Sequence, residues 1–197
     1  MVQYELTDFN PLGVNNNKTQ IVLADSKRNL INYVQSLKFR YNKKNPYLPN
    51  YLIAKNGDIY TIMEPTKYSN FLQNSQVDKN SITIVLENLG SLKKIPMNDY
   101  YINWIGDIYK KKVYERKWRD EYFWDPYEKI QFENLSKLTK KLCAEFQIPK
   151  ECIGHNVKQE GVEFFKGIVS RSNYDSDSKD VNPAFDFKLF KELLEND

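Results

Sequence analysis

The stretch Ser81–Glu87, SITIVLE, decides the fold of this chain. Its apolar centre is continuous and rich in β-branched residues, a pattern typical of a strand in the middle of a sheet that is covered on both faces. A carboxylate, Glu87, directly follows the last apolar residue. Ligands of such sheets usually bind beyond the strand ends, so Glu87 is a candidate site residue. The alternative is that Glu87 caps or pairs with a neighbouring loop.

The segments before this strand alternate between strand and helix patterns. Residues 19–24, TQIVLA, form a β-branched run that predicts a buried strand. Asp25 or Ser26 is expected to cap the helix that follows, in which apolar residues recur at helical spacing. Residues 51–63, YLIAKNGDIYTIM, predict a β-hairpin around an Asn-Gly turn.

The segments after the strand continue the alternation. Residues 127–146 carry one apolar stripe and predict a helix. ECIGH, residues 151–155, is expected to form a short strand that delivers His155 to its end. Asp186 is expected to cap a C-terminal helix. Ala24, Glu87 and His155 would then all lie at strand ends, where they could share one site.

These patterns predict an α/β fold with a central mixed β-sheet flanked by helices, because strands and helices alternate and the hairpin adds an antiparallel pair. A length of 197 residues suits one domain, 1–197, with an irregular lead-in at 1–18 and an aromatic-rich insertion at 91–126. The insertion holds all three tryptophans. Its aromatic side chains either bury one another or form a platform for sugar faces or a protein partner.

The composition indicates a folded protein and argues against nucleic-acid binding. Hydrophobic residues make up 41% and charged residues 28%, which is typical of a folded chain. The net charge of +3 is mild, and acidic residues surround the basic run at 110–112, so we expect no nucleic-acid partner. Cys143 and Cys152 are expected to be free thiols, since their spacing does not indicate a disulfide or metal pair.

No apolar stretch approaches the roughly 18 residues that predict a membrane span, so no membrane association is expected. The first residues lack the pattern of a secretory signal peptide, which predicts a protein that is cytoplasmic on synthesis. A phage lysis protein would look the same, and the abundance of Lys, Asn, Ile and Tyr suggests an AT-rich genome, bacterial or phage.

Several motifs, in their order along the chain, resemble the zinc-dependent N-acetylmuramoyl-L-alanine amidase family, which includes phage lysozyme-type amidases and peptidoglycan recognition proteins. The motifs are IVLADS, YLIAKNGDIY, IVLEN, GH and DVNPAFDF, and the resemblance covers about residues 19–195. It implies that His155 and Asp180 are metal ligands. It also implies that Glu87 is the base that takes a proton from a zinc-bound water and returns it to the leaving amine.

The chain departs from the family pattern at several positions. The first histidine ligand falls on Ala24, and the lysine expected to hold the oxyanion falls on Ser178, with Lys179 adjacent. A substrate-side histidine falls near Leu72, and a Tyr-His pair of the hairpin becomes Pro49-Asn50. A metal ligand, a cation and two cleft histidines are therefore replaced together.

These departures predict a peptidoglycan amidase-like protein that has lost the usual zinc mechanism. We expect it to bind a muropeptide-like or other small ligand in the retained cleft, with no metal or a weakly bound one, so whether it is an enzyme stays open. Candidate ligand-binding residues are Arg171, Lys179 and Asn50, although Arg171 could instead pair with Asp175 or Asp177.

Two other functions stay open. The first is an active amidase with zinc in a rebuilt site, in which Asp25 or water completes the shell around His155 and Asp180. The second is a phage or bacterial interaction module that uses the aromatic insertion. The structural alternatives are that His155 is simply a hydrogen-bonded residue and that Asp180 forms a turn before Asn182-Pro183.

Overall fold

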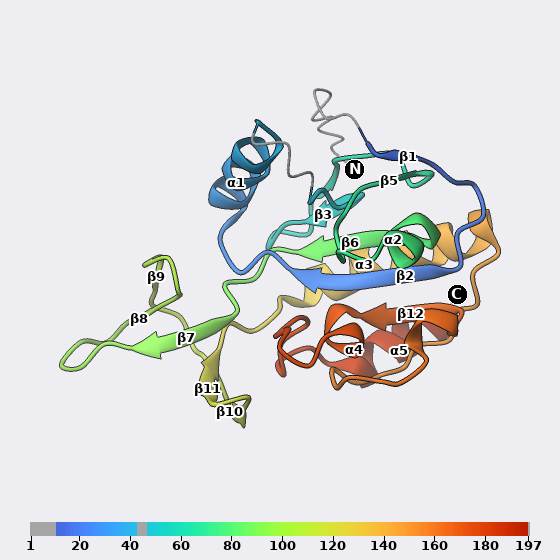
Figure 1. Cartoon of the computed structure of the whole chain (residues 1–197). Coiled ribbons are helices and arrows are strands. Elements are labelled where there is room, and N and C mark those ends of the chain that lie inside the picture. Colours follow the sequence, from blue (N-terminus) through green and yellow to red (C-terminus); the bar gives the residue numbers. More distant parts are fainter. Residues whose placement is uncertain (1–10, 43–46, 197) are drawn as a thin grey trace.

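A computed structural model describes residues 11–42 and 47–196 of the chain. Its centre is a five-stranded sheet in the order β12-β2-β6-β3-β4 (Figure 1). The strands are β2 (Gln20–Asp25), β3 (Tyr51–Ile53), β4 (Ile59–Thr61), β6 (Ser81–Leu86) and β12 (Gly167–Ser170). All neighbours are parallel except the β3–β4 hairpin. The mixed sheet and the central place of SITIVL are thus confirmed.

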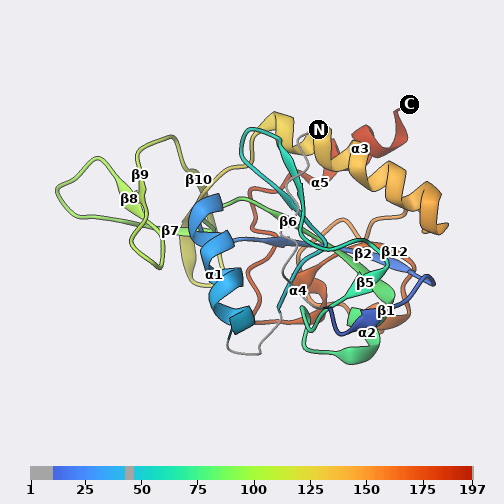
Figure 2. The same cartoon turned by 90° about the horizontal axis from the view of Figure 1, so that it is seen from above.

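Helices cover both faces of this sheet, and Figure 2 shows α1 (Leu30–Asn42) and α3 (Lys129–Phe146) on opposite sides. Alternate residues of β6 face the two sides. Ile84 packs into the larger core beneath α3 and α5 (Phe187–Glu195), whereas Val85 packs into the core beneath α1. Because a buried cluster covers each face of the sheet, both sets of alternate side chains in β6 are buried. This explains why its centre is apolar without interruption.

Short elements complete the α/β body. Strand β1 lies within the predicted lead-in 1–18 and pairs with β5, while residues 1–10 of that segment lie outside the described part. The short elements are β1 (Gly13–Val14), β5 (Lys67–Tyr68), α2 (Ser75–Asn80), the 3₁₀ turn η1 (Val162–Phe164) and α4 (Arg171–Tyr174). In the described chain, no helix has the length and apolarity that a membrane crossing requires.

The aromatic-rich insertion forms a second, antiparallel sheet in the order β10-β11-β7-β8-β9, which projects away from the body (Figure 1). Its strands are β7 (Ser91–Lys94), β8 (Tyr101–Ile102), β9 (Ile108–Tyr109), β10 (Tyr114–Trp118) and β11 (Glu121–Trp124). Trp124 is fully buried, and its ring centroid lies 5.5 Å from that of Trp118. Some of the aromatic side chains therefore bury one another, as one of the two alternatives required.

Two local predictions are wrong. Helix α1 begins at Leu30, and neither Asp25 nor Ser26 caps it, because β2 continues through Asp25. Instead, the side chains of Asn29 and Glu87 accept hydrogen bonds from amides of its first turn. Glu87 follows β6 and is far from α1 in the sequence, so a local pattern does not identify it as an acceptor for this helix.

ECIGH does not form a strand either. Within it, Cys152 makes only an isolated bridge to Ile168, and His155 lies in a bend. The edge position beside β2 belongs to β12, whose Gly167–Ser170 segment has a fully buried, β-branched centre. The two cysteines are free, as expected, and burial raises the pKa of the Cys143 thiol to about 11.

Candidate binding cleft

A cavity of about 330 Å³ lies beyond the carboxyl end of β2, and we call it the cleft. Loops that follow β2 and β12 reach it because parallel strands end at the same edge of the sheet. Its lining residues are Asp25, Ser26, Lys27, Arg28, Tyr33, Arg40, Tyr47, Phe71, Gln73, Trp104, Arg171 and Asp180.

Asp180 is fully buried in the wall of the cleft between two cations. The Nζ atom of Lys27 lies 3.0 Å from its Oδ1, and Nη1 of Arg171 lies 3.6 Å from its Oδ2. Arg171 is the first residue of α4, so the end of β12 brings it to this edge. Its guanidinium also lies 5.6 Å from the ring centroid of Phe71. A buried carboxylate requires such partners, because removing its charge from water is costly.

Asp25 is the last residue of β2 and provides the second carboxyl group. Its Oδ1 accepts a hydrogen bond from the Tyr127 hydroxyl at 2.6 Å, and its Oδ2 accepts one from the Asn182 amide at 3.0 Å. Burial raises the pKa of Asp25 well above its ordinary value, and the nearby charge of Asp180 adds to the effect. As strand alternation requires, Ala24 faces the other way, into the core beneath α1.

The lining is strongly cationic. Lys27, Arg28, Arg40 and Arg171 outnumber the two carboxyl groups of Asp25 and Asp180. The Arg28 guanidinium lies 4.8 Å from the ring centroid of Trp104. Guanidinium groups held against aromatic rings lose less freedom when they bind a planar anion. The cleft is therefore suited to a small ligand with carboxylate groups.

Glu87 lies outside the lining of the cleft. Its Oε1 accepts a hydrogen bond from the Leu30 amide and its Oε2 accepts one from the Lys55 amide, both at 2.8 Å. It lines a separate cavity of about 180 Å³, and this cavity shares no lining residue with the cleft. In this position Glu87 caps the positive end of α1 and joins it to the β3–β4 turn.

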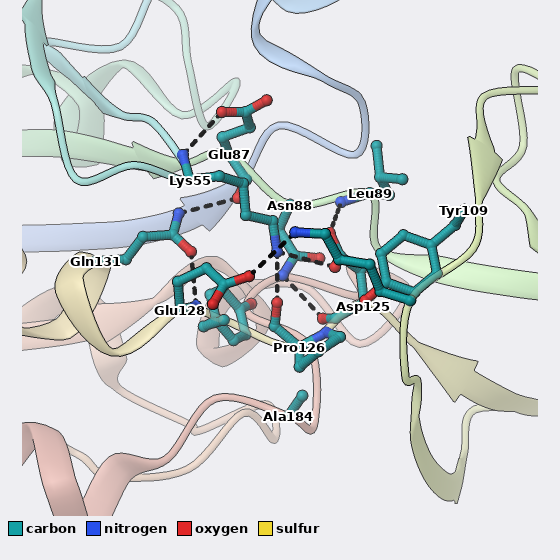
Figure 3. Close-up of polar contacts among 12 residues, drawn as sticks. Lys55, Glu87, Asn88, Leu89, Tyr109, Asp125, Pro126, Glu128, Gln131 and Ala184 are labelled. Atoms are coloured by element: carbon teal, nitrogen blue, oxygen red, sulfur yellow. Dashed lines mark hydrogen bonds and ion pairs between the residues drawn. The ribbon is translucent and has the colours of Figure 1, made fainter.

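A polar network beside Glu87 fixes the base of the insertion (Figure 3). Lys55 Nζ lies 2.9 Å from Oδ1 of the buried Asp125, whose Oδ2 accepts a hydrogen bond from the Leu89 amide at 2.7 Å. The Asn88 side chain donates to the carbonyl of Asp125 at 2.9 Å. Burial raises the pKa of Asp125, and the charge of Lys55 opposes the shift. The contacts join both ends of the insertion to β6 and the hairpin.

The other candidate residues also lie apart from the cleft lining. His155 is half-buried, and its Nδ1 lies 3.3 Å from the Val157 amide that donates to it. Asn50 is buried, and its side chain donates to two backbone carbonyls and accepts from the Thr83 amide. Lys179 pairs with Glu121 of β11 at 2.8 Å. The structure thus brings Arg171 and Asp180 together, and leaves His155, Glu87, Asn50 and Lys179 elsewhere.

Zinc does not fit this arrangement of donors. Ala24 has no ligand atom, His155 does not line the cleft, and both oxygens of Asp180 face cationic side chains. Throughout residues 11–42 and 47–196, no three His, Cys, Asp or Glu side chains are grouped so that they could hold a metal ion. Lys27 and Arg171 instead supply the positive charge that the buried carboxylate requires.

Sequence reasoning missed Lys27, Arg28 and Arg40, and it considered Asp25 only as a helix cap and as a replacement metal ligand. One signal was available, because DSKR directly follows the apolar run of β2. Charged residues immediately after a buried parallel strand lie at the edge where ligands bind. No comparable signal marks Arg40, which the first helix brings to the cleft from its C-terminal end.

A family model and several solved structures match the chain. Residues 15–163 match the family model described as N-acetylmuramoyl-L-alanine amidase. The amidase LysC from Clostridium intestinale has a similar structure, with a TM-score of 0.61, 12% identity and coverage of 100% of this chain and 99% of that one. AmiD from E. coli gives a TM-score of 0.55 and 14% identity over 95% of this chain and 61% of its own length.

AmpDh3 from Pseudomonas aeruginosa is also similar, with a TM-score of 0.55, 13% identity and coverage of 98% of this chain and 66% of that one. Identities this low show the shared fold and no more. Among curated proteins, no sequence relative matches the chain.

Proposed function

The chain belongs to the N-acetylmuramoyl-L-alanine amidase family, and we propose that it binds a peptidoglycan fragment in the cleft without the zinc mechanism of that family. One observation carries the proposal. Lys27 and Arg171 neutralise the buried Asp180, so cationic side chains occupy the surroundings of the carboxylate that the family motif assigns to the metal.

The chemistry of the ligand follows from the surplus of positive charge. AmiD was solved with anhydro-N-acetylmuramic acid-L-Ala-D-gamma-Glu-L-Lys, and AmpDh3 with anhydromuramic pentapeptide. A γ-linked glutamate keeps a free α-carboxylate, and the peptide end supplies another. Arg28 and Arg40 are suitable partners for such groups, because charge-assisted hydrogen bonds to arginine are strong and bidentate.

Calorimetry with N-acetylmuramoyl-L-Ala-D-γ-Glu-L-Lys tests the proposal. We expect saturable binding and no release of free peptide on prolonged incubation. Arg40→Ala should weaken the affinity about 5- to 30-fold, which corresponds to the loss of a contact of about 1–2 kcal/mol. Arg116→Ala is the matched control, since Arg116 is exposed on β10 outside the cleft, and it should bind as the wild type does.

Two results would contradict the proposal. Absence of binding at millimolar ligand would exclude this ligand class. Steady release of the peptide would instead indicate an active amidase. Blocking both carboxylates of the ligand as amides should reduce the affinity more than Arg40→Ala does, because it removes the ionic contacts of Arg28 and of Arg40.

A further inference from the structure

The insertion carries a second cavity, of about 570 Å³, which we call the groove. Strands β7, β8 and β11 and the turn after β8 form it. Its lining residues are Ser91, Leu92, Lys93, Lys94, Ile102, Asn103, Trp104, Glu121, Tyr122 and Phe123. The groove is larger than the cleft and belongs to the part of the chain that projects from the body (Figure 1).

Trp104 lines both the groove and the cleft, so the two cavities share a wall. Its indole Nε1 donates a hydrogen bond to the carbonyl of Lys27 at 2.8 Å, and the Arg28 guanidinium stacks on its ring. The residue is nevertheless 63% exposed. A tryptophan that is fixed at its edge and open on its surface offers a rigid stacking platform between the two cavities.

The groove combines aromatic surface with hydrogen-bonding side chains. Tyr122 is 52% exposed, and the Phe123 ring packs against the Tyr101 ring at a centroid distance of 5.1 Å. Glu121 adds a carboxylate to the same lining, and the exposed Lys93 and Lys94 add ammonium groups. Sugar rings have apolar C–H faces and hydroxyl edges, so a lining that mixes aromatic and polar groups suits them better than it suits an apolar peptide segment.

The groove is also held in place. Lys179 pairs with Glu121 at 2.8 Å, and Asn32 of α1 donates to Asp107, in the turn after β8, at 2.9 Å. These contacts tie both sides of the groove to the body, so that binding costs little ordering of the chain. Lys179 therefore anchors the groove to the body, a role that the sequence pattern did not indicate.

We propose that the groove binds the glycan part of the peptidoglycan fragment whose peptide carboxylates occupy the cleft. The inference rests on the proposed function. It places the saccharide of that muropeptide on the insertion, with a sugar ring over Trp104 and the adjoining sugar near Tyr122. Lys93 and Lys94 then lie beside the sugar chain, where they favour anionic substituents.

Calorimetry with three ligands tests this assignment: the tripeptide L-Ala-D-γ-Glu-L-Lys, the same peptide on an N-acetylglucosaminyl-N-acetylmuramoyl disaccharide, and chitotetraose. We expect the disaccharide-peptide to bind at least about tenfold more tightly than the peptide alone. Tyr122→Ala should abolish most of that advantage and leave the affinity for the tripeptide unchanged. Chitotetraose should bind weakly to the wild type and not measurably to Tyr122→Ala.

Tyr114→Ala is the matched control, because Tyr114 is another exposed tyrosine of the same hairpin but does not line the groove. It should retain the full advantage of the sugar-bearing ligand. Equal affinity for the two peptide ligands, or an equal effect of both tyrosine variants, would overturn the inference. The proposed function would stand if the tripeptide still bound, and the groove would then be assigned to a protein partner. If no ligand bound, both proposals would be wrong.

Discussion

At the scale of single residues, the pairing of Lys27 with Asp180 is the contact on which the cleft depends. Asp180 is fully buried, whereas 38% of the Lys27 side chain is exposed, so solvent screens part of their attraction. We expect Lys27→Met to lower the free energy of unfolding by about 1–2 kcal/mol, less than for a fully buried pair because Arg171 remains. Urea denaturation measures this change.

A double-mutant cycle separates this pairing from simple loss of packing. Lys27→Met combined with Asp180→Asn should be less destabilised than the sum of the single variants, since no buried charge is left without a partner. Lys188→Met removes an exposed lysine and should have almost no effect. Strict additivity of the two single variants would show that the two side chains do not interact.

Asp25 predicts how stability depends on pH. Its pKa is raised by burial and by Asp180, with Lys27 and the Tyr127 hydroxyl opposing the shift. Above the ordinary carboxyl pKa of 3.8, the native protein therefore holds more protons here than the unfolded chain does. The free energy of unfolding is therefore highest, as far as Asp25 is concerned, below pH 3.8. It falls as the pH rises from there toward the raised pKa of Asp25 in the native protein.

Asp25→Asn removes this titration. The stability of the variant minus that of the wild type should therefore increase as the pH is raised from 4 to 8. The urea midpoint at each pH measures this difference. Asp177→Asn, at an exposed carboxylate, should follow the wild-type profile. Parallel profiles for Asp25→Asn and the wild type would mean that Asp25 is ionised throughout this range.

At the scale of elements, Glu87 joins β6 to the start of α1. Glu87→Gln keeps an acceptor oxygen but removes the negative charge from the positive end of the helix. We expect a loss of about 1 kcal/mol in the free energy of unfolding, as for other helix caps, and no change in muropeptide affinity. Thermal denaturation and calorimetry measure the two quantities.

The exposed Glu160 offers the control substitution, Glu160→Gln, which should change neither quantity. Unchanged stability together with lost muropeptide affinity would place Glu87 at the ligand instead. That outcome would return it to the role that the amidase motif implies.

Helices and strands were predictable from the sequence where one continuous segment carried the whole apolar pattern. The sheet's central strand and α3 have continuous or periodic apolar patterns, and both were confirmed. The insertion gave no such signal, because strands such as β10, YERKW, are short and mostly charged. Their sheet depends on pairing with one another and on the buried Trp124, which a local pattern does not express.

At the scale of the whole molecule, the arrangement of donors predicts the metal content. Protein purified without affinity metal or chelator should contain well below one zinc per chain by mass spectrometry, because His155 and Asp180 line no common site. His155→Ala should leave that content unchanged. One zinc per chain that disappears in His155→Ala would contradict the proposed function and support a rebuilt amidase site.

By itself the sequence determined the α/β class, the order of the main elements and the family, because hydrophobic periodicity and motif order are properties of consecutive residues. Arg171 and Asp180, which it named as a candidate ligand-binding residue and a candidate metal ligand, follow β12 closely and both line the cleft. Only the tertiary structure decided that Lys27 reaches Asp180 and that Glu87 binds the amides of Leu30 and Lys55. These contacts join segments far apart in the chain, and their partners depend on how strand ends and loops pack together.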